Sequence, residues 1–518
     1  MIDIAYAAPS ALHATHERTE LALAANLLRP VAFHGEVAQH GAMLRLALRA
    51  LGQALWSPAH RLPGAMALNP VPDPVMTVHP DRIGIEAFTQ DMGAYVSLQI
   101  DPAVFRLLGE PHFGSSHIDF SVWLWNALGE LRTSGRTQFR VDSAGQDLAA
   151  ANLLEQKLAL PGAWVRSVLE MQAAMARPGM RLRLRPVDLL AALHFLALNP
   201  ARVSPQALRY EMRPGEPATL VIEPFEHRIL LQGAAHGATE PHSVRTWSRR
   251  KLSLIEPLLP FAQAVDVDLK SHALPSFHAV RLPGMSFVLG LPGSGLALPP
   301  EISPPSVSLP QRALHTLADA FHATTPALAN ALNASEPDTA SALAALARAG
   351  RVMADLHAGG WRHRELFVPP LDTAALFPPE PCREAATHLL AEPGSVQLRS
   401  LVAEEQPKAR RFKHPDTGER IERVVAYHQW RIRGFSEGFE PEILVSDEEQ
   451  LSFGTCGCGF FQEHLLNRGP CPHMLALLWL SDPQRREVAR VHAGPALAPL
   501  LSRATLERPG PGDEGDAT

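Results

Sequence analysis

The residues best suited to chemistry in this 518-residue chain are three cysteines and one histidine near its C-terminus. Cys456 and Cys458 are separated by one residue, twelve residues follow, and Cys471 and His473 are again separated by one residue. Three thiolates and one imidazole are the ligands of a closed structural zinc site, whereas a catalytic zinc usually keeps one position open for water. The sequence therefore predicts one structural Zn²⁺ held by these four residues.

The local sequence around the four residues supports convergence on one ion. Two residues that are two apart on an extended segment point to the same side, so Cys456 and Cys458 can both reach a single metal. Cys471-Pro472-His473 opens an apolar run at 474–480, and proline is favoured in the first turn of a helix. The second ligand pair is therefore expected at a helix N-terminus, where the helix dipole favours a thiolate.

Other interpretations of these residues stay open at this point. The cysteines could be small buried apolar residues and His473 an ordinary core or surface histidine. His464, which lies between the two pairs, could replace His473 as the fourth ligand. The fourth cysteine, Cys382, lies in a proline-rich stretch and is expected to be an incidental exposed thiol rather than a nucleophile. With only four cysteines, a disulfide framework does not organise this chain.

Cys456-Gly457-Cys458 followed by Cys471-Pro472-His473 resembles the SWIM zinc finger, whose pattern is CxC, a variable gap and then CxH. The resemblance covers about Ser395 to Asp482 and implies strands that carry the first pair and a helix that carries the second. It implies a module for DNA binding or protein interaction. More weakly, 244–252 and 361–366 resemble stand-alone bacterial SWIM proteins, some of which are associated with MoxR-type AAA+ ATPases and von Willebrand A proteins.

A basic segment precedes the cysteines. Residues 408–433 contain eight basic and three acidic side chains, a net charge of +5, and Phe412, Tyr427 and Trp430 are interleaved with them. Such a composition suits phosphate contacts and base stacking. The alternative is a solvated strand face with Trp430 in the core of the small domain. The candidate nucleic-acid-binding residues are Lys408, Arg410, Arg411, Lys413, Arg431 and Arg433.

Two further basic groups are weaker candidates. Arg348, Arg351 and the stretch Trp361-Arg362-His363-Arg364 could be the phosphate contacts of a winged-helix module, although no base-reading helix stands out. An ordinary helical connector with solvated arginines is the alternative. A helix predicted at 244–259 would carry Arg245, Arg249, Arg250 and Lys251 on an exposed face.

Composition and charge limit the classes of function. The net charge of −6 includes −3 from residues 504–518, so the rest of the chain is nearly neutral. No run approaches the ~20 apolar residues of a membrane span, and residues 1–10 lack the charged and apolar regions of a secretory signal, so we expect a cytoplasmic protein with no membrane partner. The motifs GxxxxGK[ST] and HExxH are absent, so we expect no enzyme, although an active site built from scattered residues of 1–300 stays open.

Periodicity predicts a multidomain α+β fold, with mixed α/β N-terminal domains, a winged-helix-like middle segment and a ββα-type finger. Helices are expected at 17–56 with breaks, 118–131, much of 151–201, 341–348 and 352–357. Strands are expected at 82–88, 95–100, 138–141, 424–432 and 440–453, and 277–291 is expected to be a hairpin. The predicted domains are 1–150 and 151–298, both α+β, the middle segment 311–367, a proline-rich linker 368–393, the finger 395–502 and a disordered tail 503–518.

Two functions of different classes follow from these observations. The first is a non-enzymatic zinc protein whose finger binds DNA or RNA, favoured by the basic segment beside the metal ligands. The second is an adaptor that binds a protein partner such as a MoxR-type ATPase, favoured by the nearly neutral body and the long N-terminal domains.

Overall fold

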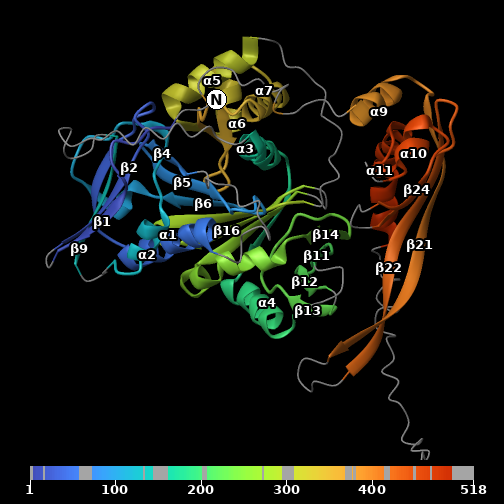
Figure 1. Cartoon of the computed structure of the whole chain (residues 1–518), viewed down its shortest axis with the longest axis horizontal. Coiled ribbons are helices and arrows are strands. Elements are labelled where there is room, and N and C mark those ends of the chain that lie inside the picture. The colour runs from blue at the N-terminus through green and yellow to red at the C-terminus, as the bar shows by residue number, and fades with distance from the viewer. Residues whose placement is uncertain are drawn as a thin grey trace, which may run out of the picture. The chain divides into compact units, whose positions relative to one another are not determined.

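The computed structural model gives the arrangement of most of the chain (Figure 1). The chain forms two compact units, one made of Met1–Glu211, Gly215–Gly237 and Val244–Pro379, the other of Met212–Pro214, Ala238–Ser243 and Glu380–Thr518. Mixed helices and sheets confirm the α+β class. The structure describes residues 4–15, 18–57, 73–131, 135–143, 162–200, 207–223, 225–270, 274–293, 308–367, 376, 381–413, 420–446, 451–466 and 469–492. The predicted tail 503–518 lies outside these residues.

An antiparallel eight-stranded sheet is the centre of the first unit, with the order β10-β15-β16-β17-β6-β5-β4-β8. Its strands come from both predicted N-terminal domains, because β6 pairs with β17 across nearly two hundred residues. Local periodicity contains no signal for such a pairing. The strands are β4 Val75–His79, β5 Arg82–Phe88, β6 Tyr95–Ile100, β8 Gly114–His117, β10 Met180–Leu184, β15 Ala264–Leu269, β16 Ser276–Leu282 and β17 Met285–Leu291.

Both faces of this sheet are covered. Helix α1 (Gly41–Trp56) packs against β5 and β6, because its apolar residues recur every three or four positions. The other face, with Phe88 and Phe277, belongs to a large apolar cluster that also contains Leu169 of α3 (Gly162–Met175). The predicted hairpin is confirmed as β16 and β17, joined at Pro283-Gly284, where Gly284 has a φ of 69°.

The remaining strands of this part of the chain form two smaller sheets. The orders are β1-β2-β9-β3-β7 and β13-β12-β11-β14. Their strands are β1 Ala11–Ala14, β2 Arg18–Ala24, β3 Phe33–Val37, β7 Phe105–Leu107, β9 Arg136–Asp142, β11 Leu208–Met212, β12 Thr219–Ile222, β13 His227–Leu230 and β14 His242–Thr246. The other helices are α2 Val122–Ala127, α4 Pro186–Leu198 and the short 3-10 helices η2 Pro102–Val104, η3 Arg249–Leu254 and η4 Glu256–Phe261.

Two predicted helices are wrong in this part of the chain. In 17–56 only the end is helical, and β2 and β3 precede α1, because alanine and leucine fit a period of two as well as a helical period. In 244–259 the last residues of β14 are followed by the 3-10 helices η3 and η4, and not by an α-helix. The basic residues there do not form an exposed face: Arg249 and Lys251 are buried, and Lys251 contacts Asp91 at 2.5 Å.

The middle segment has the order of a winged-helix module: helix, strand, helix, helix, strand, strand. Its small sheet has the order β18-β20-β19. The predicted helix 352–357 is wrong, because Val352 begins a strand that turns back at Gly359-Gly360, both with a positive φ, and pairs with Trp361–His363. The elements are α5 Ser308–Ala320, β18 His322–Ala323, α6 Thr325–Leu332, α7 Glu336–Arg348, β19 Val352–Ala354 and β20 Trp361–His363.

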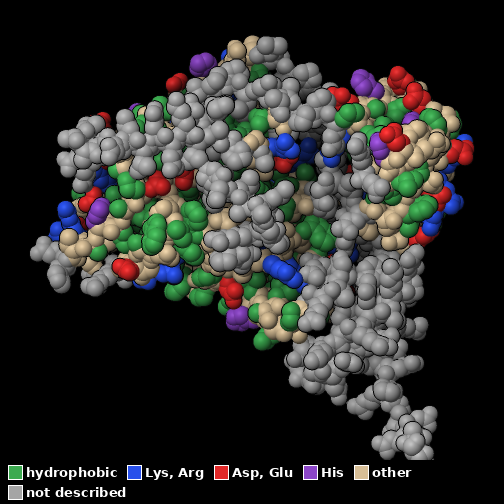
Figure 2. All heavy atoms as spheres, in the orientation of Figure 1, with side chains coloured by type: hydrophobic (Ala, Val, Ile, Leu, Met, Phe, Trp, Pro, Cys, Tyr) green, Lys and Arg blue, Asp and Glu red, His purple; other side chains and the backbone are tan. Residues whose placement is uncertain are grey.

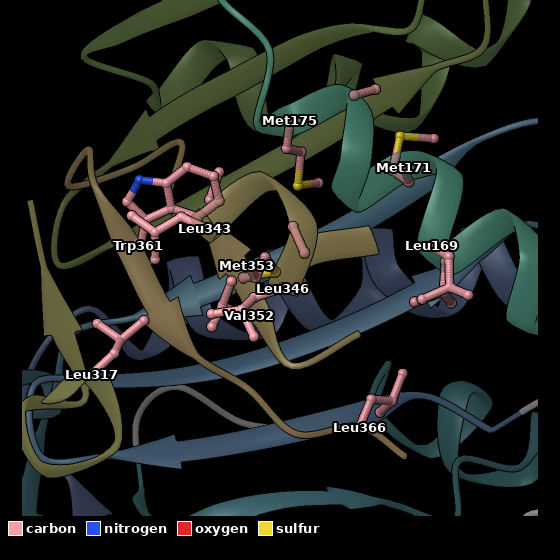
Figure 3. Packing of buried hydrophobic residues seen from close by; sticks show 14 of the residues in the cluster. Leu169, Met171, Met175, Leu317, Leu343, Leu346, Val352, Met353, Trp361 and Leu366 are labelled. Carbon is pink, nitrogen blue, oxygen red and sulfur yellow. The ribbon is translucent and has the colours of Figure 1, made fainter. Parts of the chain in front are cut away.

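This module shares its core with the rest of the first unit. Leu343, Leu346 and Trp361 lie in the same apolar cluster as Met171 and Leu169 of α3, as Figure 3 shows. A module that buries its side chains against a neighbouring helix and sheet is an integral part of the unit rather than a separately docked domain.

Ion pairs add a polar connection between the module and the large sheet. Arg362, only 3 % exposed, donates to Asp355 at 2.5 Å and to both carboxylate oxygens of Asp81 in the β4–β5 turn at 2.9 and 2.8 Å. Arg364 contacts Glu86 of β5 at 3.0 Å and is also buried. Burial would raise the pKa of Asp355, but the charge of Arg362 holds it below its usual value. These arginines are internal contacts and not a free basic wing.

The second unit contains one helix where a linker was expected. Helix α9 (Pro381–Ala391) places Ala386 and Leu389 in a small core with Leu475 and Ala476. Cys382 lies on this helix, half-buried beside that core. Of the rest of the predicted linker, residues 368–375 and 377–380 lie outside the described residues. Among the described residues, no helix is long and apolar enough to cross a membrane.

Removal of Arg362 tests whether the winged-helix-like module depends on its ion pairs. Arg362→Ala leaves the buried carboxylate of Asp355 without its partner, so we expect a loss of about 3–5 kcal/mol in the stability of the first unit. Arg348→Ala, at an exposed position of α7, is the matched control and should change stability by less than about 0.5 kcal/mol. Urea unfolding followed by tryptophan fluorescence measures both, and equal midpoints would contradict the structural role.

Candidate metal centre

The four predicted ligands lie at the ends of three elements of the second unit. Cys456 directly follows β24 (Leu451–Thr455), and Cys458 directly precedes α10 (Gly459–His464). Cys471 precedes α11 (Pro472–His492), and its carbonyl accepts the first bond of that helix, from the Leu475 N–H at 3.0 Å. His473 lies in the first turn. Helix α11 therefore starts where the apolar run and Pro472 predicted it.

The ligand atoms of these residues form one compact cluster. The three sulfurs and the histidine nitrogen lie within 4.8 Å of one another, and all four residues are buried. His473 Nδ1 is 3.9 Å from Cys456 Sγ and 4.0 Å from Cys471 Sγ. Tetrahedral zinc with bonds of about 2.0–2.3 Å requires ligand atoms roughly 3.5–3.8 Å apart. A small inward shift satisfies this requirement, so the cluster fits one structural zinc ion.

The electrostatics of the cluster favour a thiolate at Cys456, whereas the hydrogen bond between the two sulfurs raises the pKa of Cys471. The pKa of Cys456 is lowered to about 4, because the Cys471 thiol and then the His473 ring hydrogen-bond to its sulfur. The backbone N–H of Cys458 also donates to Cys456, and that of Met474 donates to Cys471 at the start of α11. Backbone donors that face sulfur stabilise the negative charge that a zinc ligand carries.

Two residues outside the ligand set fix the orientation of His473. The Glu437 carboxylate lies 3.9 Å from Nε2, the ring nitrogen that faces away from the cysteines, and the Phe439 ring lies 4.7 Å from the imidazole ring. A carboxylate near the free nitrogen of a ligating histidine favours the tautomer that leaves Nδ1 for the metal. Sequence reasoning missed Glu437, because it lies outside the motif, in the turn between β22 (Arg420–Ser436) and β23 (Glu442–Ser446).

His464 is not part of the cluster. It ends α10, where its ring contacts Phe460 and Nε2 lies 3.8 Å from Glu463. The group of potential ligands that the described residues bring together contains His473 and not His464. The fourth ligand is therefore the histidine of the CxH pair.

An antiparallel four-stranded sheet supports the ligand-bearing helix. The order is β21-β22-β23-β24, with β21 Val396–Lys413, β22 Arg420–Ser436 and β23 Glu442–Ser446 before β24. Helix α11 packs against β21 and β22. Trp430, Ile432 and Ile443 are buried between sheet and helix, so Trp430 belongs to the core, as the alternative interpretation expected.

A glycine on β22 permits the close approach of α11. A Cβ at Gly434 would lie 2.3 Å from Leu477 Cδ1 and 2.4 Å from the Gln397 backbone oxygen, closer than atoms can pack. Glycine inside a strand often marks such an approach, and this was the available signal in the sequence.

The structure separates the candidate nucleic-acid-binding residues into two groups. Arg431 contacts Glu404 and Glu442, each at 2.5 Å, and Arg433 contacts Glu442 at 3.1 Å, so these two charges are compensated within the finger. Side chains of both signs intermingle on its surface (Figure 2, right). Lys408, Arg410, Arg411 and Lys413 lie on β21, and their side chains are outside the described residues.

Comparisons with known proteins identify the segment around the metal ligands. Residues 442–481, which contain all four ligands, match the family model of the SWIM zinc finger. No curated protein matches the chain. Among solved structures, proliferating cellular nuclear antigen from Entamoeba histolytica is similar at a TM-score of 0.31 and 11 % identity, over 50 % of this chain and 98 % of that one. A similarity at this level carries no conclusion about fold or function.

Loss of one ligand tests the metal site. Cys458→Ser should abolish stoichiometric zinc binding and unfold the finger, because structural zinc supplies much of the folding free energy of such small domains. The first unit should keep its own thermal transition. Cys382→Ser, which changes a cysteine outside the cluster, should retain one zinc per chain. Metal analysis and circular dichroism melting measure both effects, and full zinc content in Cys458→Ser would refute the ligand assignment.

The contact at Gly434 generates a second test. Gly434→Ala forces α11 away from the sheet, so we expect a loss of about 1–3 kcal/mol in finger stability. Weaker zinc retention in a chelator titration should accompany it, because one ligand, His473, lies in the first turn of α11 and another, Cys471, directly precedes the helix. Gly459→Ala, where an added Cβ meets no atom within 4 Å, is the control. Equal zinc retention in the two variants would argue against the proposed coupling.

Proposed function

We propose that this chain, which carries a SWIM zinc finger at residues 442–481, is a non-enzymatic zinc-binding protein whose finger binds nucleic acid. The observation that supports the proposal is the concentration of positive charge beside a metal-stabilised fold. Residues 408–433 carry a net charge of +5 in a chain whose total is −6. Neutralisation of phosphates by such charge supplies most sequence-independent affinity for nucleic acids.

The basic residues that carry the proposal lie on the distal part of β21. Arg431 and Arg433 form ion pairs with Glu404 and Glu442. Because the glutamates neutralise their charge, these arginines attract a phosphate less strongly. The remaining candidates, Lys408, Arg410, Arg411 and Lys413, lie beyond these pairs along β21. The proposal therefore rests on these four residues more than on Arg431 and Arg433.

The winged-helix-like module offers little for base reading. The exposed first turn of α7, the helix that would read bases, carries Glu336 and Asp338, which repel phosphate. The charges of Arg362 and Arg364 are neutralised by internal ion pairs with Asp81 and Glu86. The nucleic-acid-binding role is therefore assigned to the finger.

A specific observation favours a second function, that of a protein-binding adaptor. Val402 and Phe453 are 48 % and 45 % exposed and lie on one cross-strand row of the finger sheet, Val402–Arg431–Leu444–Phe453. Exposed apolar side chains beside charges are common where proteins bind proteins. A MoxR-type AAA+ ATPase is the partner class that the sequence resemblance suggests. The cytoplasm, where thiols stay reduced, suits either function.

A salt titration tests nucleic-acid binding. Arg410→Gln combined with Arg411→Gln removes two charges from β21, so the plot of log affinity against log salt concentration should become shallower by about one to two. The full chain is titrated with labelled duplex DNA and duplex RNA of one sequence. Arg399→Gln, which removes an exposed charge paired with Glu440, is the control.

The outcomes separate the two functions. Binding that weakens steeply with salt, with a reduced slope only in the double variant, supports the nucleic-acid function. An unchanged slope in the double variant refutes the assignment of Arg410 and Arg411. No binding to either nucleic acid, together with recovery of purified ATPase partner in a pull-down that Phe453→Ser abolishes, supports the adaptor.

A further inference from the structure

The two long strands of the finger extend beyond its sheet as a two-stranded arm. Strands β21 and β22 remain paired from Val396↔Ser436 to Lys413↔Arg420. Strand β23 accompanies β22 only as far as Gln429↔Ser446. Among the described strands, residues 405–413 and 420–428 therefore pair only with each other, and Figure 1 shows this part of the orange hairpin extending away from α11. We call these residues the arm.

The arm has the dimensions of a DNA-reading element. Its strands contain nine residues each, from 405 to 413 and from 420 to 428. At about 3.4 Å per residue the arm is roughly 30 Å long, close to one turn of B-form DNA. A two-stranded β-ribbon fits the major groove of B-DNA, which is about 12 Å wide.

The register of the arm places like charges opposite each other. Arg410 is paired with Arg423 and Lys413 with Arg420, whereas Arg411 is paired with Glu422. Directly opposed like charges destabilise an antiparallel pair of strands. In the adjoining sheet the same strand behaves differently, because Arg433 is opposite Glu442. The arm keeps a positive excess, because its strand residues comprise six basic and two acidic side chains.

Protection against aggregation does not account for this arrangement. Charged residues and proline, here Pro407, do discourage an exposed strand from pairing with another chain. Cross-strand pairs of opposite charge would give the same protection without repulsion. An anion of high charge density lying against the arm would offset the repulsion of the two like-charged pairs.

From these observations we infer that the arm is a β-ribbon that enters the major groove of double-stranded DNA. The inference rests on the proposed nucleic-acid function and names its ligand. Phosphates border the groove on both sides, which matches basic residues on both strands. Duplex RNA is excluded as the preferred ligand, because the major groove of A-form RNA is too deep and narrow for such a ribbon. The zinc-stabilised sheet holds the base of a ribbon that would be marginally stable alone.

Binding assays on the full, zinc-loaded chain test the ligand. Fluorescence anisotropy compares a duplex DNA of about 20 base pairs, or two helical turns, with the duplex RNA and the single strand of the same sequence. We expect duplex DNA to bind at least about tenfold more tightly than the other two, because neither offers a wide major groove. Equal or tighter binding of duplex RNA or single strands overturns the inference while leaving the proposed nucleic-acid function intact. Absence of binding to all three overturns both.

Variants of the arm test its role. Arg410→Gln with Arg423→Gln should lower the salt slope by about 1.8 and should not lower the melting temperature, because the substitutions remove a repulsion. Arg106→Gln with Arg399→Gln removes two exposed, ion-paired charges outside the arm and should leave the slope unchanged. A lower melting temperature with an unchanged slope would show a structural role and refute the inference.

A truncation provides a variant that keeps the sheet. Replacing residues 410–423 by Asn-Gly joins Ala409 to Val424, which are directly paired, through a two-residue turn suited to a hairpin. The truncated chain should keep one zinc ion and lose duplex-DNA affinity at least about tenfold. Retained affinity together with retained zinc would refute the arm as the binding element.

Discussion

The convergence of four ligand atoms on one point is the constraint on which the finger depends. The two ligand pairs come from separate segments, one at the end of β24 and one at the start of α11. Bringing them within 4.8 Å fixes the helix end relative to the last strand of the sheet. With α11 in place, Met474 and Leu477 cover the sheet and complete a core that is otherwise small. The metal site therefore determines the packing, and the packing holds the long strands β21 and β22.

The same constraint explains residues that have no metal-binding chemistry. Gly434 is needed because the helix lies so close to β22 that a side chain cannot fit between them. Glu437 and Phe439 are needed because a histidine in a helix's first turn can rotate, and only one ring orientation directs Nδ1 to the cysteines. These positions are determined by the ligand geometry although they lie before the motif in the sequence.

Sequence reasoning succeeded where a signal is local. Cysteine spacing, Pro472 and the apolar run after it predicted the ligands and the start of α11, and the turn at Pro283-Gly284 predicted a hairpin. Sequence reasoning failed where pairing between segments far apart in the sequence determines the secondary structure. Residues 18–24 became a strand because β9, more than a hundred residues away, pairs with them. Residues 352–354 also became a strand, although their partner, 361–363, lies close by in the sequence. The burial of Arg362 could not be predicted either, because Asp81 lies almost three hundred residues away.

Arginine has three environments in this chain, and its charge acts differently in each. Arg362 is buried between two carboxylates and connects parts of the first unit. Arg431 lies on the surface of the finger, compensated by two glutamates. Arg410 and Arg423 hold directly paired positions on the two strands of the arm. A count of charges along the sequence gives all three the same weight. Strand register distinguishes them, because the partner opposite each arginine determines whether its charge serves folding or remains available for a ligand.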